Sequence, residues 1–269
     1  PMSEMRLEAD VEKLSGELLD VVGAVGGNDV DLRGVLTTYR AGGTVAEAFR
    51  GTVERLFAGF DLLVTDAADP HVKRASLPVL LGDVERAAEH ERLVRERTEE
   101  LQAAGYSAPV TVRQGAANVF FHGPAGRERL AKTRDGWIAR EAKIRFTVDE
   151  VAERMRAEPG AFSPNVFLRP VVESAVFPTL AYVGGPAETA YFAQIGPLFR
   201  AYGIRPPVAY PRLSVRLVPE AAAEKARALE VTEEELRLPD HELVSAVARR
   251  RLPAEVNERL HALRAALVD

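Results

Sequence analysis

Arg169, Arg212 and Glu188 are the residues whose types and surroundings best suit the binding of a charged or polar ligand. Each arginine adjoins a proline, and the glutamate follows the pair Gly184-Gly185. A guanidinium can hold a carboxylate or a phosphate through two parallel hydrogen bonds, and a carboxylate can accept hydrogen bonds from an amine or a hydroxyl group. The competing interpretation of the arginines is a pair of structural salt bridges.

The glycine pair indicates a turn that brings a ligand close to the backbone. Gly184 and Gly185 carry no Cβ atom and can adopt positive φ angles. Pro186 suits the first turn of a following helix, and Glu188 would lie near the positive end of that helix. The N–H groups there could also receive a phosphate, although Glu188 already supplies negative charge. The alternative is an ordinary strand-to-helix turn with an acidic residue in the first turn of the helix.

The segments around these residues follow the order strand, helix, strand. Residues 175–183 are apolar and rich in β-branched and aromatic side chains, residues 188–202 have helical spacing, and residues 206–210 are again apolar. This order is typical of a βαβ crossover. Ligands bind just beyond the carboxyl ends of such strands, where the sequences GGPAE and PRLS lie. The pattern predicts an α/β fold with the site at one edge of a parallel sheet.

The rest of the chain is expected to be mainly helical, with a small β-rich insert. Thr44 and Thr147 each precede a glutamate by three residues, the spacing of a capping box at the start of a helix. Asp66 and Asp69 could bind a ribose or a metal, but aspartates after a strand more often form a turn and cap a helix. The expected helices cover residues 5–25, 45–58, 81–104, 148–156, 220–229, 232–236, 243–248 and 253–268, and the expected strands cover residues 60–65, 108–112, 117–122, 137–138 and 143–146.

The composition of the chain argues against several classes of binding partner. The net charge of -5 and the pI of about 5.7 argue against nucleic acid as a partner. No apolar run reaches the roughly 18 residues of a membrane helix, so no membrane partner is expected. The chain has no cysteine, and its five histidines lack metal-ligand spacing, so no metal is expected. The absence of cysteine is also compatible with a reducing cytosol, and a cytoplasmic location is expected.

Three consecutive blocks of sequence resemble one enzyme family. They are SPNVFLRPVVES (163–174), FPTLAYVGGPAETAYFAQ (177–194) and GIRPPVAYPRLS (203–214), and the upstream segments FAGFDLLVTDAADPHVKR and AANVFFHGPAGRERL agree with them. Together they are similar to BshC, the cysteine-adding enzyme of bacillithiol biosynthesis. The resemblance extends from about Thr44 to Glu220.

The resemblance implies a nucleotidyltransferase-like, Rossmann-like parallel sheet with a small β-rich insert and a helical C-terminal region. That region would form a coiled coil and a homodimer. The implied reaction joins L-cysteine to glucosaminyl-malate through an amide bond, in the last step of bacillithiol synthesis. Because a carboxylate must be activated before it forms an amide, ATP or another nucleotide is the implied cofactor.

The positions that match the family's motifs supply the candidate site residues, and the element pattern supplies the expected parts of the chain. The implied catalytic residues are Glu188, Arg169 and Arg212. The implied substrate-binding residues are Asn165, Tyr182, Gly184, Gly185, Pro186, Tyr191 and Ser214. The expected parts are an N-terminal helical or Rossmann-like part (1–65), a connecting insert (66–160), the second half of the Rossmann-like sheet (161–218) and the helical C-terminal region (219–269).

The chain departs from the family pattern in its length. Family members are about twice as long, and their acidic-histidine nucleotide motif is not found here. The chain therefore resembles the middle and second half of a family member, and half a sheet would expose an unpaired strand edge and apolar surface. The alternatives are a non-catalytic binding or scaffold module and, more weakly, a glycosyltransferase-like binder of nucleotide sugars.

Overall fold

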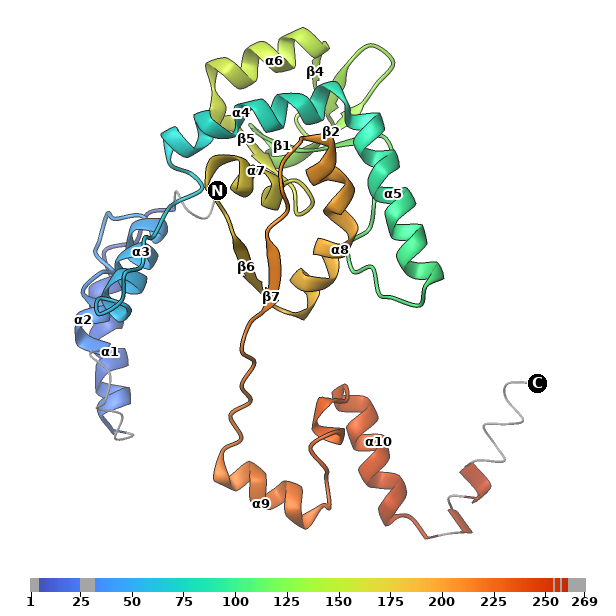
Figure 1. The fold of residues 1–269 in the computed structure, drawn as a ribbon. Coiled ribbons are helices and arrows are strands. Elements are labelled where there is room, and N and C mark those ends of the chain that lie inside the picture. Colours follow the sequence, from blue (N-terminus) through green and yellow to red (C-terminus); the bar gives the residue numbers. More distant parts are fainter. Residues whose placement is uncertain (1–4, 25–31, 254, 257, 261–269) are drawn as a thin grey trace. The chain divides into compact units, whose positions relative to one another are not determined.

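The computed structural model describes residues 5–24, 32–253, 255–256 and 258–260. The chain divides into two compact units, Pro1–Arg212 and Leu213–Asp269. Figure 1 shows the elements of both units. Within the described residues, no helix has the length and apolar character needed to cross a membrane.

An antiparallel sheet with helices packed against it forms the centre of the first unit. Its strand order is β4-β3-β2-β1-β5. Helices α4 and α5 both contact β1, and α6 packs beside α4 (Figure 1). The strands are β1 (Ala116–Gly123), β2 (Gly126–Lys132), β3 (Trp137–Ala139), β4 (Ile144–Phe146) and β5 (Phe162–Pro164), and the helices are α4 (Pro70–Glu85), α5 (Ala87–Ala103) and α6 (Val148–Ala157).

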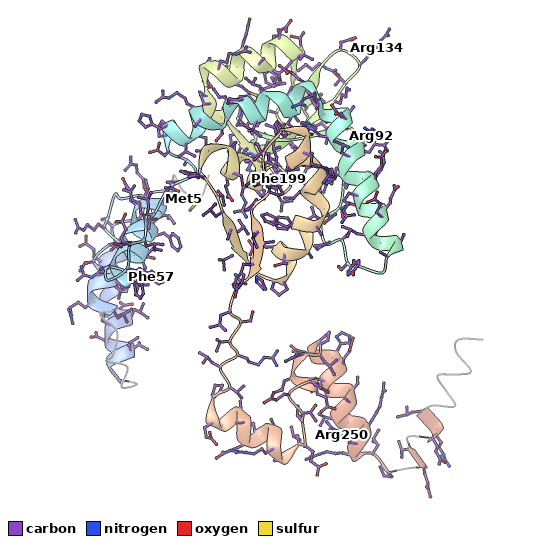
Figure 2. The ribbon with its side chains drawn as sticks, in the orientation of Figure 1. Met5, Phe57, Arg92, Arg134, Phe199 and Arg250 are labelled. Carbon is purple, nitrogen blue, oxygen red and sulfur yellow. The ribbon has the colours of Figure 1, made fainter. Side chains whose placement is uncertain are left out.

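The predicted βαβ crossover is present in the same unit. Strands β6 (Ala181–Gly184) and β7 (Val208–Pro211) are parallel, and α8 (Pro186–Ala201) connects them. Helix α8 packs on α5, and its residue Phe199, labelled in Figure 2, is fully buried. The two strands form a separate sheet whose outer edges have no partner strand among the described residues.

The predicted capping boxes start two helices as expected. The Glu47 N–H donates to Thr44 Oγ1 at 3.2 Å, and the Thr44 N–H donates to Glu47 Oε2 at 2.8 Å. Thr147 and Glu150 make the same pair of bonds at the start of α6. Helix α3 (Val45–Leu56), which Thr44 caps, follows α1 (Val11–Ala24) and α2 (Leu32–Leu36).

Two predicted strands are wrong. Residues 60–65 form no strand, and Phe60 and Leu63 are 72% and 83% exposed, because no neighbouring strand among the described residues offers backbone partners. Residues 108–112 form no strand either. There, the side-chain amide of Gln194 satisfies both backbone groups of Val110.

Two predicted boundaries also change. The segment expected to begin a strand at residue 175 is the end of α7 (Arg169–Val176), because Pro170 in the first turn favours a helix, and β6 begins only at Ala181. The helix expected over 81–104 is two helices that meet at Arg86. The first of them starts earlier than expected, because the Asp69 carboxylate accepts from the His71 and Val72 N–H groups. Asp69 therefore caps a helix, as the more common interpretation held.

The second unit contains short helices. They are α9 (Glu220–Ala228), the 3₁₀ helix Glu235–Arg237 and α10 (Asp240–Arg251). Most of the amphipathic stretch predicted over residues 253–268 lies outside the described residues, so the coiled coil stays a prediction. The four predicted parts of the chain likewise stay a prediction.

Candidate functional site

Four of the predicted site residues meet at the junction of α7, β6 and α8. Arg169 Nη2 donates to the hydroxyl oxygens of Tyr182 at 2.8 Å and Tyr191 at 3.3 Å. The Tyr182 hydroxyl donates to Glu188 Oε1 at 3.1 Å. Arg169 Nη2 also lies 3.8 Å from that carboxylate oxygen. The guanidinium is thus held in one orientation while its side chain stays 46% exposed.

The glycine pair works through close packing rather than through positive φ. Gly185 has φ -71° and ψ 175°, and Gly184 is not among the glycines with positive φ, so neither position uses the positive φ angles that glycine permits. A Cβ atom on Gly184 would lie 3.0 Å from Glu188 Cβ, and one on Gly185 would lie 3.1 Å from Arg212 Cζ. The close approach expected of a ligand is made here by the chain's own side chains.

Glu188 serves as a helix cap. Its Oε2 accepts the Gly185 N–H at 2.7 Å, which completes the start of α8. This hydrogen bond lowers the pKa of Glu188 against the opposing effect of desolvation, and Tyr182 and Arg169 lower it further. Its carboxylate therefore has a donor at each oxygen atom, which favours the interpretation of an acidic residue closing an ordinary turn.

Asn165 lies in a buried hydrogen-bond network, where it is only 2% exposed. Its Oδ1 accepts the N–H groups of Phe167 and Leu168, and its backbone carbonyl accepts the Arg169 N–H at 2.9 Å. Its Nδ2 donates to Asn118 Oδ1 at 2.8 Å. Asn165 therefore shapes the start of α7 from inside the protein.

The same network continues to a buried carboxylate. Both the backbone N–H and the side-chain amide of Asn118 donate to the Asp83 carboxylate, at 2.6 and 3.0 Å. His90 Nδ1 lies 3.0 Å from Asp83 Oδ1, and both side chains are fully buried. Asp83, Asn118 and Asn165 thus link α4, β1 and the start of α7, the helix that carries Arg169.

Three further residues predicted for the site, Arg212, Pro186 and Ser214, are all exposed. Arg212 is exposed, directly after β7, and its guanidinium packs against Gly185. Pro186 is exposed at the first position of α8. Ser214 is exposed and belongs to the second unit. The role of each of these residues in catalysis or binding stays a prediction.

Sequence reasoning missed Glu173 and the cavity beside it. The cavity has a volume of about 300 Å³ and lies between α4, β5 and α7. Arg169 and Glu173, one helical turn apart on α7, both line it. The spacing of four residues is visible in RPVVE, but the expectation of a strand next to this segment concealed it. Among the described residues, no three side chains of the metal-ligating types gather in one place.

The parallel crossover with its glycine turn and the flanking helices define a Rossmann-like α/β domain. A family model described as "Bacillithiol biosynthesis BshC, N-terminal Rossmann-like domain" matches residues 1–213. The chain belongs to the BshC family, and both the family assignment and the Rossmann-like fold class are confirmed. The expectation that the chain represents the middle and second half of a family member stays a prediction.

Curated relatives agree with this assignment. The chain is 35% identical to a protein of Koribacter versatilis named "Putative cysteine ligase BshC", over 96% of this chain and 47% of the relative. Relatives with the same name from Flavobacterium johnsoniae and Solibacter usitatus are 32% and 35% identical, over 78% and 73% of this chain. The chain spans less than half the length of each of these three relatives.

Proposed function

We propose that this chain is part of a cysteine ligase that joins L-cysteine to glucosaminyl-malate through an amide bond, in the last step of bacillithiol synthesis. The observation that carries the proposal is the family match over residues 1–213. The names of the relatives support the ligase activity. The expected cytoplasmic location and homodimer are further predictions that the reaction itself does not require.

In the proposed reaction, the amine of the glucosaminyl group attacks the activated carboxyl carbon of cysteine. A C–N bond forms, the bond to the activating group breaks, and negative charge develops on the carbonyl oxygen in between. A donor held in advance near that oxygen lowers the barrier. Arg169 suits this role, because Tyr182 and Tyr191 fix its guanidinium and part of it stays exposed. Arg212, packed on Gly185, is the second cationic candidate.

The glycine turn does not fit the phosphate groups of a nucleotide. The Gly185 N–H, which would otherwise point to an anion, already donates to the Glu188 carboxylate at 2.7 Å. A phosphate at this position would meet negative charge. We expect ATP or another nucleotide to activate the carboxylate, but not to bind through its phosphate groups at this turn.

The test measures by mass spectrometry whether bacillithiol forms from glucosaminyl-malate, L-cysteine and ATP. This chain is assayed alone and together with the remaining part of a full-length relative. Product in the mixture, and loss of that product with Arg169→Ala, would support the proposal. No product in either assay, with substrate binding retained, would favour a non-catalytic binding module instead.

A matched variant separates charge from geometry at the same position. Arg169→Lys keeps the positive charge but loses the forked donors that contact Tyr182 and Tyr191. We expect it to restore little of the activity that Arg169→Ala removes. Full activity in the lysine variant would mean that only the charge matters.

A further inference from the structure

The Glu173 carboxylate on α7 differs from the other carboxylate near Arg169, that of Glu188, in its lack of hydrogen-bond donors among the described residues. Within the part of the chain that the structure describes, no hydrogen bond reaches its side chain, and its ion pair with Arg169 Nε is long, at 3.8 Å. Its side chain is only 37% exposed. Burial raises the pKa of Glu173, and the nearby charge of Arg169 only partly opposes this effect. A half-buried carboxylate of this kind is costly unless a ligand supplies the missing donors.

The cavity beside Glu173 has apolar walls and few charged groups. Its larger apolar lining residues include Leu80, Phe162, Val172, Val176 and Phe177, and its charged lining residues are Lys73, Arg169 and Glu173. A small apolar cavity with a few convergent polar groups is the usual form of a small-molecule site. Its volume of about 300 Å³ is enough for a small metabolite.

Opposite charges stand side by side at the edge of this cavity. Arg169 Nε and Glu173 Oε1 are 3.8 Å apart, and both residues line the cavity. The ammonium and the carboxylate of an α-amino acid are joined through a single carbon atom, so they present opposite charges at a similar short spacing. A small uncharged side chain would then point toward the apolar wall.

We propose that this cavity binds a small α-amino acid, with its ammonium group on Glu173 and its carboxylate toward Arg169. The identification of that amino acid as L-cysteine rests on the proposed ligase function. Holding the ammonium on Glu173 keeps the amine of cysteine away from the reaction and presents its carboxyl group beside Arg169. Glu188 is the less suitable partner for the ammonium, because both of its carboxylate oxygens already have donors.

The binding of L-cysteine to the whole chain, measured by calorimetry under reducing conditions, tests the assignment directly. We expect Glu173→Gln to weaken binding by at least about tenfold, because a neutral amide loses the charge-assisted hydrogen bond to the ammonium group. N-acetyl-L-cysteine, which lacks the ammonium group, should lose a similar factor. Glu153→Gln, which removes the same charge from an exposed position on α6, should bind as the parent does.

Three results would overturn the assignment. They are equal binding by Glu173→Gln and the parent, equal binding of cysteine and its N-acetyl form, and no binding by a chain that circular dichroism shows to be folded. The ligase assay separates this inference from the proposed function. If cysteine binding depends on Glu173 but no product forms, the ligase proposal is wrong and the assignment of the cavity stands. If product forms and Glu173→Gln depends on the cysteine concentration as the parent does, the assignment of the cavity is wrong and the ligase proposal stands.

Discussion

Two glutamates each lie 3.8 Å from the Arg169 guanidinium, and their surroundings differ. Glu188 accepts hydrogen bonds from Gly185 and Tyr182, and these donors hold its pKa below the ordinary value. Glu173 accepts none from the described residues, and burial raises its pKa. Glu188, in the glycine motif, thus caps α8, while the carboxylate of Glu173 has no hydrogen-bond donor among the described residues.

The same type of side chain can serve either the fold or a ligand. A carboxylate whose acceptors are filled by the protein stabilises the fold and has little left to offer a ligand. A carboxylate that the fold leaves unsatisfied lowers stability, and such a cost is typical of binding sites. Substitutions that affect stability in opposite directions can therefore tell the two glutamates apart.

The largest effect is expected at the buried network of Asp83, Asn118 and Asn165, which supports the start of α7 and therefore the position of Arg169 and Glu173. Asp83→Ala would leave His90 and the two donors of Asn118 without their acceptor. Removing one partner of a buried charged network costs about 3–5 kcal/mol, and we expect this loss in the free energy of unfolding measured with urea. A loss below about 1 kcal/mol would mean that the network does not support α7.

The next effect concerns the cap at Glu188. Glu188→Ala removes the acceptor of the Gly185 N–H, and we expect it to lower the free energy of unfolding by about 1 kcal/mol. Because the folded-state pKa of Glu188 is depressed, its contribution is present above the unfolded-state pKa. It is lost as the pH falls through the folded-state pKa. Urea titrations of the variant and the parent should therefore converge at acidic pH, and a constant difference would contradict the capping role.

The smallest effect should have the opposite sign. The folded-state pKa of Glu173 is raised, so the parent loses stability as the pH rises from the ordinary value of 4.5 through the raised one. Glu173→Gln removes this loss, and we expect a melting temperature about 1 °C higher than that of the parent at neutral pH. Arg169 and Glu188 face this carboxylate, and Lys73 lines the same cavity. The gain should vanish below pH 4.5. A lower melting temperature at neutral pH would show that Glu173 stabilises the fold.

Local signals in the sequence predicted the elements that depend on local interactions. Both capping boxes and the order β6, α8, β7 follow from short-range patterns that the structure reproduces. The position of Glu188 just beyond a strand end placed it at a site, whereas Tyr182 and Tyr191 were expected there only from the resemblance to the family motif. The structure brings all three to Arg169.

The errors arose where distant residues decide the structure. Residues 60–65 have the composition of a strand but no partner to pair with among the described residues. The burial of Asn165 depends on Asn118 and Asp83, which lie far away in the sequence. The spacing of Arg169 and Glu173 is visible in the sequence, but that spacing does not reveal that no described residue donates a hydrogen bond to the Glu173 carboxylate.

The side chain of Gln194 on α8 connects the loop between α5 and β1 to that helix. Its amide accepts from the Val110 N–H and donates to the Val110 carbonyl, as a residue of a neighbouring strand would do. It also donates to Thr98 on α5, and Arg97 donates to the carbonyl of Ala193. One side chain therefore fastens the loop and two helices together, so that a displacement of α8 would carry residues 104–115 with it.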